Sequence, residues 1–175
     1  MKSRLSKIVI FVFFVANLGI ADYVKRDNAV YYKAETEQVD ERKVDDADSK
    51  TFVELNKIYG KDSKNVFYED KKLENADFKT FQIIGEVNGK DKKYLYNYDE
   101  KMEINPKDFK LYKNKDKLLY FRNNGKLYIG GSFLEVEYVQ DLDSFEAIDE
   151  GYSKDKYNIY YAGTPIYDVD KSTFQ

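Results

Sequence analysis

Asp77-Phe78-Lys79-Thr80-Phe81 is one of five segments in which an acidic or amide residue is followed, four positions later, by Phe. The other four segments end at Phe52, Phe109, Phe145 and Phe174. The five phenylalanines are separated by 29, 28, 36 and 29 residues, which is a spacing typical of repeat proteins. This motif predicts an array of about five repeats with a basic period of 28–29 residues.

Each repeat also carries an apolar triplet that ends in Tyr. The triplets are Val30-Tyr31-Tyr32, Val66-Phe67-Tyr68, Tyr94-Leu95-Tyr96, Leu118-Leu119-Tyr120 and Ile159-Tyr160-Tyr161. In three repeats the final Tyr precedes the Phe by 13 residues, whereas the first and fourth repeats need 20 and 25. We therefore expect insertions in these two repeats: a charged, solvated loop at 33–45 and an extra hairpin at 123–137.

The triplets are predicted strands, and both faces of each strand are apolar because side chains alternate along an extended chain. This pattern fits a strand buried on both sides, and it fits equally an exposed aromatic stripe. Turn chemistry follows the triplets at 69–72, 97–100 and 162–163, with short return strands after it. The pairs Asn88-Gly89 and Asn124-Gly125 predict tight hairpins, since both residue types tolerate positive φ.

The segment before each Phe predicts a capped single helical turn. A short side-chain acceptor such as Asp77 bonds the free amides two and three residues on, and Pro106 directly after Asn105 suits the first position of such a turn. The Phe then lies in the core. Together these elements predict an all-β array of hairpin-type repeats, each with one capped turn, in a solenoid-like or stacked-meander arrangement.

The N-terminus has the features of a secretory signal peptide, which we assign to residues 1–21, ahead of a repeat domain at 22–175. Lys2, Arg4 and Lys7 precede an apolar run at 8–20, which is shorter than the roughly 20 residues of a membrane-spanning helix. We expect an exported protein in the periplasm, on the cell surface or secreted. The alternative is a chain anchored by an uncleaved N-terminal segment.

Composition excludes several kinds of chemistry. The chain has no Cys and no His, so the domain is stable without disulfides and has no His-based catalytic triad. Without residues 1–21 it keeps 26 basic and 32 acidic residues, a net charge of −6, with both signs interleaved. Nucleic acid is therefore not an expected partner. No glycine-rich phosphate loop is present, and we expect no cofactor.

Acidic clusters are the remaining candidates for chemistry. They lie at Asp45-Asp46-Ala47-Asp48, Asp141-Leu142-Asp143 and Asp168-Val169-Asp170. None has the glycine and distal Glu of a calcium loop, so we interpret them as turns or helix caps and expect no metal site. Hydrolysis by paired carboxylates stays open, because such pairs form in space and not in sequence.

One row of side chains is a candidate for binding. Tyr31, Phe67, Leu95, Leu119 and Tyr160 are the middle residues of the five triplets. Exposed rings at Tyr31, Phe67 and Tyr160 would stack on the sugars of a cell-wall polymer. Aromatic side chains equally dominate the packing of a core, and we favour the core for this row. The final tyrosines of the triplets, from Tyr32 to Tyr161, are expected to be structural, with hydroxyls that bond backbone groups.

The stretch Gly151-Tyr152-Ser153-Lys154-Asp155-Lys156-Tyr157-Asn158-Ile159-Tyr160-Tyr161 closely resembles the repeat of the bacterial DKNYY family, and Tyr59 to Tyr68 is a second copy. The resemblance covers residues 23–175, most strongly in the second and fifth repeats. It implies an exported protein of a functionally uncharacterised family. It implies no substrate, catalytic residue or cofactor.

Three functions follow as hypotheses. The first is a non-catalytic protein-interaction module of the cell envelope, the second a cell-wall or glycan-binding module that uses Tyr31, Phe67 and Tyr160, and the third a carboxylate-dependent hydrolase. The partner is thus an envelope protein or a glycan. Because no apolar strand follows Phe174, we interpret the last repeat as incomplete and expect self-association through it.

Overall fold

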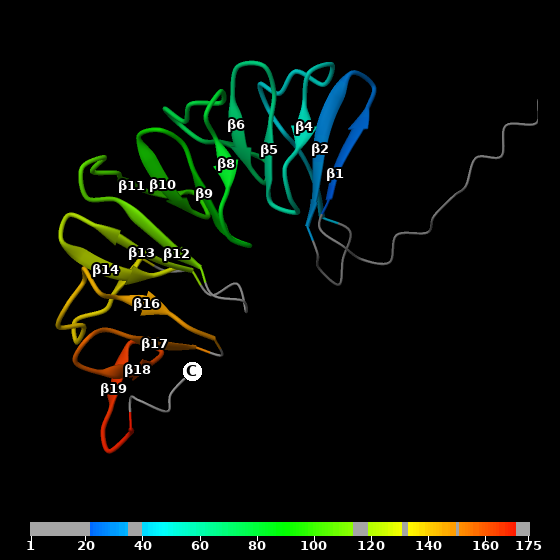
Figure 1. The fold of residues 1–175 in the computed structure, drawn as a ribbon. Coiled ribbons are helices and arrows are strands. Elements are labelled where there is room, and N and C mark those ends of the chain that lie inside the picture. Colours follow the sequence, from blue (N-terminus) through cyan, green and yellow to red (C-terminus); the bar gives the residue numbers. More distant parts are fainter. Residues whose placement is uncertain (1–21, 35–39, 114–118, 131–132, 150, 171–175) are drawn as a thin grey trace, which may run out of the picture.

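The computed structural model describes residues 22–34, 40–113, 119–130, 133–149 and 151–170 (Figure 1). The expected signal peptide at 1–21 and the Phe of the fifth turn, Phe174, lie outside the described residues. Within the described residues the chain forms strands and turns and contains no helix.

The strands form five small antiparallel sheets, each built from consecutive strands. The first three sheets are β1 (Asp22–Arg26), β2 (Ala29–Ala34) and β3 (Asp40–Lys43); β4 (Val53–Glu54), β5 (Tyr59–Lys61), β6 (Val66–Tyr68) and β7 (Lys71–Lys72); and β8 (Gln82–Ile83), β9 (Asn88–Lys90), β10 (Tyr94–Asn97) and β11 (Glu100–Glu103). The last two are β12 (Lys110–Lys113), β13 (Leu119–Asn123), β14 (Lys126–Ile129) and β15 (Leu134–Glu135); and β16 (Glu146–Ala147), β17 (Tyr152–Lys154), β18 (Ile159–Tyr161) and β19 (Thr164–Ile166). The expected all-β repeat array is confirmed.

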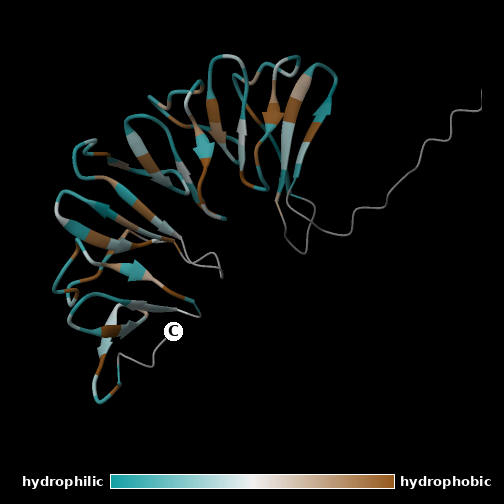
Figure 2. Ribbon diagram, in the orientation of Figure 1, coloured by the Kyte–Doolittle hydropathy of each residue, from teal (hydrophilic) through white to brown (hydrophobic). Residues whose placement is uncertain are grey.

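The five sheets follow one another along a curved arc, with the first sheet at one end and the fifth at the other (Figure 1). Hydrophobic and hydrophilic residues alternate along the strands, and hydrophobic residues also lie in the segments that connect the sheets (Figure 2). Four separate clusters of buried side chains each join residues of two successive sheets. As in other stacked repeat proteins, the core therefore consists of separate layers between neighbouring sheets. The sheets do not surround one central core.

This stacking explains why the triplets are apolar on both faces. Phe67 packs in the layer between the first and second sheets, while its neighbour Val66 packs in the layer between the second and third. Successive side chains of a strand point to opposite faces. The third strand of an interior sheet is consequently buried on both sides, so both of its faces are apolar.

The segments that precede each Phe are hydrogen-bonded turns, and the expected single helical turn is not present as a helix. The amides of Thr51 and Phe52 both donate to the carbonyl of Asp48, and the Asp48 carboxylate accepts from the amide of Lys50 at 3.0 Å. The turns at Asp77, Asn105 and Asp141 show the same side-chain bond to the amide two residues on. The capping role of these residues is thus present without a helix.

Of the two predicted Asn-Gly hairpins, one is confirmed and one is wrong. Asn124 and Gly125, at φ of 53° and 73°, join β13 to β14. Asn88 and Gly89 instead lie inside strand β9. A Cβ on Gly89 would overlap the ring of Phe81, so this glycine serves close packing and not a turn.

The three predicted turns after the triplets are confirmed. Glu69, Tyr98 and Ala162 have φ of 50°, 54° and 46°, and each begins the connection between the third and fourth strands of its sheet. The return strands follow as expected. The three turns thus share positive φ at their first residue, and the second residue also has positive φ only at Gly163.

The two predicted insertions need correction. The segment 33–45 is not simply a solvated loop, because β2 extends to Ala34 and β3 pairs with it over 40–43. Arg42 on β3 helps to hold this strand in place, because it forms ion pairs with Glu69 and Asp70 of the second sheet at 2.9 and 2.6 Å. In the fourth repeat, the hairpin at 124–125 is the central hairpin of the sheet and not an extra one.

The predicted equivalence of the fourth triplet with the triplets of the second and fifth repeats is therefore wrong. Leu119 and Tyr120 lie on the second strand of their sheet, β13, whereas the triplets of the second and fifth repeats lie on the third strand. The true counterparts of Val66 and Phe67 are Leu127 and Tyr128 on β14, because Leu127 packs toward the fifth sheet and Tyr128 toward the third.

Candidate interaction surface

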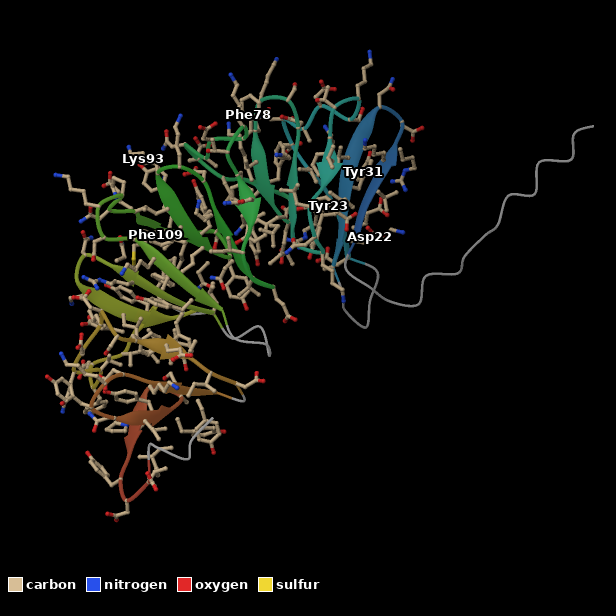
Figure 3. The ribbon with its side chains drawn as sticks, viewed as in Figure 1. Asp22, Tyr23, Tyr31, Phe78, Lys93 and Phe109 are labelled. Carbon is tan, nitrogen blue, oxygen red and sulfur yellow. The ribbon has the colours of Figure 1, made fainter. Side chains whose placement is uncertain are left out.

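The predicted aromatic row lies mainly in the core. Phe67 and Tyr160 are fully buried, and so is Leu95, while Leu119 is 4% exposed. Tyr31 is half-buried on the first sheet, under the guanidinium of Arg26 at 4.5 Å from the ring centroid (Figure 3). A ring that water does not reach cannot stack on a ligand unless the sheets separate. The structure therefore does not bring Tyr31, Phe67 and Tyr160 together on a surface.

Tyr160 is further engaged by a buried carboxylate. Its hydroxyl donates to Asp155 at 2.7 Å, and Asp155 also accepts from the amides of Tyr157, Asn158 and Asp141 at 2.7 to 2.9 Å. Burial alone would raise the pKa of the Asp155 carboxyl, but these donors hold the pKa below its usual value. Burial, together with the negative acceptor, raises the pKa of Tyr160.

This carboxylate arrangement recurs, and we call it the aspartate latch. Asp62 accepts from the amides of Lys64, Asn65 and Asp48, and Asp91 accepts from those of Lys93, Tyr94 and Asp77. In the fourth sheet Asn123 takes this place, with its carbonyl oxygen accepting from Asn105 at 2.8 Å. Each latch joins the turn that enters a sheet to the central hairpin of the same sheet.

Sequence reasoning missed the latches, although a signal was present. Asp62, Asp91 and Asp155 each follow the capping Asp of their turn by 14 residues. A constant spacing between two acidic residues indicates a structural pair in each repeat. The aspartates are therefore structural groups, bound to backbone amides and buried.

A second recurring contact joins neighbouring sheets. The hydroxyl of Tyr23 donates to the carbonyl of Ile58 at 2.9 Å, that of Tyr59 to Val87 at 2.9 Å, and that of Tyr120 to Gly151 at 3.4 Å. Each acceptor lies just before or at the start of the second strand of the following sheet. Of the final tyrosines expected to bond backbone groups, Tyr120 makes this contact, and Tyr23 and Tyr59 are its real counterparts.

In two of the three acidic clusters an aspartate caps a turn, Asp48 in the first and Asp141 in the second. The amide of Lys50 lowers the pKa of Asp48, and the ammonium of Lys156 lowers the pKa of Asp141. Among the residues that the structure describes, no group of three acidic side chains is placed to hold a metal ion. Over the same residues, no helix is long and apolar enough to cross a membrane.

Exposed apolar side chains gather at the C-terminal end of the arc. Eight large apolar residues are exposed among the described residues, and six of them lie between 134 and 169: Leu134, Tyr138, Tyr157, Tyr161, Tyr167 and Val169. Leu134 and Tyr138 flank a groove of about 290 Å³ between the fourth and fifth sheets, which Ile129, Val136 and Thr164 also line. Leu134 and Tyr138, exposed beside this groove, make it a candidate interaction site.

At the other end of the arc, the first sheet carries charged pairs beside Tyr31 and its cross-strand partner Val24. On the outward face of the first sheet, Glu41 forms ion pairs with Arg26 at 2.6 Å and Lys33 at 3.9 Å, while Arg26 covers Tyr31. Charged pairs on a terminal face are a common way to end an array or protect a sheet. The first sheet thus has ion pairs on its outward face, whereas most of the exposed large apolar side chains lie between 134 and 169.

These features define a repeat protein of stacked antiparallel β-meanders. A sequence model of the DKNYY family matches residues 23–150, and the chain belongs to this family. The match spans the first four sheets and β16, and it ends before β17. Neither the curated proteins nor the solved structures gave a match to the chain.

Proposed function

We propose that the chain is an exported, non-catalytic protein-interaction module of the cell envelope, and that its contact surface is the C-terminal end of the arc. The gathering of exposed apolar side chains between 134 and 169 is the observation that carries this proposal. A stack of sheets with exposed apolar side chains near one end is suited to bind another protein surface.

Several observations support a non-catalytic role. The sequence has no His or Cys, and the buried aspartates Asp62, Asp91 and Asp155 are each held by backbone amides. Catalytic carboxylates need access to a substrate, and these three are at most 5% exposed. These three buried carboxylates therefore stabilise the fold and are not accessible to a substrate.

The proposal of export rests on the N-terminal sequence. Three basic residues, an apolar run at 8–20 and small residues at Gly19 and Ala21 fit a cleaved signal peptide. N-terminal sequencing of the chain recovered from the envelope and medium of an expressing bacterium tests this. A start at Asp22 is expected, while an intact Met1 in the membrane fraction would favour the anchored alternative.

Photo-crosslinking in exporting cells tests the interaction. A photoreactive amino acid replaces Tyr138, which is 61% exposed beside the groove, and in a matched variant it replaces Tyr98, which is 41% exposed on the third sheet. We expect a defined protein adduct from position 138 and none from position 98. Equal labelling at both positions, or an adduct with glycan alone, would contradict the proposal.

A further inference from the structure

The groove between the fourth and fifth sheets has a packed base and an exposed rim. It lies between the segment that contains β15 and the turn that joins β18 to β19. At the base, a Cβ on Gly163 would lie 2.9 Å from the side chain of Val136, so the two segments are in close contact. At the rim, Leu134 and Tyr138 are 62% and 61% exposed. Apolar side chains thus face solvent beside a base that is already formed.

The size of the groove suits a side chain of a partner protein. Its volume is about 290 Å³, whereas pockets that enclose most of a drug-sized molecule begin at roughly 300 Å³. Protein interfaces obtain most of their binding energy from a few anchoring side chains that fill pockets on the partner. The groove therefore fits an apolar anchor of this kind.

The part of the chain that forms the groove is strongly acidic. Residues 134–175 include 10 acidic and 3 basic residues, a net charge of −7, whereas residues 22–133 include 22 acidic and 23 basic residues, a net charge of +1. The sequence has no charged residue between Lys126 and Glu135, so this division does not depend on the exact boundary. The acidic excess is therefore a property of the last part of the chain and not of the repeats in general.

The basic side chains near this end do not cancel the acidic excess. Four of them form ion pairs with its carboxylates at 2.5 to 3.4 Å: Lys126 with Glu135, Arg122 with Asp143, Lys154 with Glu146 and Lys156 with Asp141. Even when Arg122 and Lys126 are counted with residues 134–175, the net charge is −5. Glu137 lines the groove together with Glu135, and both carboxylates raise the pKa of Lys126, Glu135 more strongly. The electrostatic potential at the groove is thus negative.

We propose that the groove receives a basic segment of a partner protein, with an apolar side chain in the groove and Lys or Arg side chains beside Glu135 and Glu137.

Complementary charge steers such a partner to the groove and disfavours partners of the wrong sign. The same negative potential repels anionic phospholipid and anionic polymers. This inference rests on the proposed function, because it states the chemistry of the partner that binds the same end of the arc.

Binding of a synthetic peptide tests the inference. The probe is a short fluorescent peptide with a single Phe flanked by Lys on both sides, and the protein is the chain expressed from its full-length sequence and recovered from the exported fraction. By fluorescence anisotropy we expect saturable binding with a dissociation constant below about 100 μM at low salt, weakened at least about tenfold at about 0.5 M salt. A peptide with Glu in place of Lys should not bind, and one with Ala in place of Phe should bind at least about tenfold more weakly.

Two charge reversals locate the site. Glu137→Lys changes a carboxylate at the groove, and Glu100→Lys makes the same change of net charge on β11 of the third sheet. We expect Glu137→Lys to weaken binding of the Lys peptide at least about tenfold, and Glu100→Lys to weaken it less than about twofold.

A photoreactive peptide covers the case in which Glu137→Lys impairs folding, because it is used with the unaltered chain. With a photoreactive group in place of its Phe, the Lys peptide should label residues within 134–138 or 162–164, as located by mass spectrometry. Labels elsewhere, equal losses in the two variants, equal binding of the Lys and Glu peptides, or no binding of the Lys peptide would overturn the inference.

The two proposals fail separately. A Tyr138 photo-adduct with an envelope protein, for a chain that binds the Lys and Glu peptides equally, would retain the interaction module and remove only the basic partner. Binding of the Lys peptide in the groove, with no protein adduct at position 138 in cells, would retain the groove as a site for basic segments and remove the envelope partner.

Discussion

The recurring phenylalanines hold the same place in the sequence motif but are not buried to the same extent, so their replacement by Ala should have different effects on stability. Phe81 is 3% exposed, and its ring lies 5.5 Å from that of Tyr59 and 5.4 Å from that of Tyr96. Removing a ring from such a site costs about 3–5 kcal/mol, because the apolar contacts are lost and a cavity remains. We expect Phe81→Ala to lower the free energy of unfolding by this amount.

Phe109 is the matched control. It holds the same place in the sequence motif, but it is only half-buried, and its ring is 6.5 Å from that of Phe121. The register shows why: Phe121 stands where the second and third sheets have Gly60 and Gly89, so Phe109 has no glycine to lie against. We expect Phe109→Ala to cost about 1–2 kcal/mol, since less area leaves water.

Urea denaturation followed by far-ultraviolet circular dichroism measures both losses, and the midpoint and slope of each transition are compared with those of the parent. Equal losses for Phe81→Ala and Phe109→Ala would refute the packing difference and favour a uniform repeat.

Three further predictions concern the same framework. Gly89→Ala should destabilise the fold by about 1–3 kcal/mol in the same denaturation assay, because its Cβ would overlap the Phe81 ring; a neutral result would show that the ring moves aside. Tyr59→Phe should cost about 1–3 kcal/mol, since the hydroxyl that donates to Val87 and Tyr98 at 2.9 and 2.7 Å is lost, whereas Tyr167→Phe at a 77% exposed site should cost nothing measurable. The folded-state pKa of Asp155 is depressed, so its contribution to stability is present above the ordinary carboxyl pKa and is lost as pH falls through the folded value; Asp155→Asn should flatten the decline in urea midpoint below about pH 4, and an unchanged decline would contradict this assignment.

The repeat and its strands could be predicted because they leave a signal in the chain at fixed spacing. The capping residue and the Phe four positions later recur in every repeat, and the hairpin at Asn124-Gly125 follows from the dihedral preferences of those two residues. Positive φ at Glu69, Tyr98 and Ala162 appears where turn chemistry indicated it. Local preferences and the global fold agree at these positions.

The errors came from features that local sequence does not separate. Asn88-Gly89 has the residues of a hairpin, but Gly89 is required by the Phe81 ring, which approaches from a different part of the chain. The fourth triplet matches the apolar pattern of the others, although Leu119 and Tyr120 belong to the second strand of their sheet. An apolar triplet identifies a buried strand and does not give its order in the sheet.

The candidate surface was harder to predict than the fold. A strand between two sheets and a strand with an exposed aromatic stripe have the same sequence pattern, with apolar residues on both faces. The burial of Phe67 and Tyr160 could therefore be recognised only from the way the sheets stack. The exposed C-terminal end has no motif of its own. Tyr161 is 54% exposed, whereas Tyr32, the last residue of the first triplet, is 2% exposed.

Tyr160 and Tyr161 provide the most direct test of this account, because they are adjacent in sequence and face opposite sides of β18. Hydroxyl-radical footprinting of the full chain, with the modified tyrosines located by mass spectrometry, reads both in one experiment. We expect Tyr161, which is 54% exposed, to be modified and Tyr160, which is 0% exposed, to be protected. Modification of Tyr160 to the same extent as Tyr161 would contradict the stacked array. It would indicate that the aromatic row is exposed.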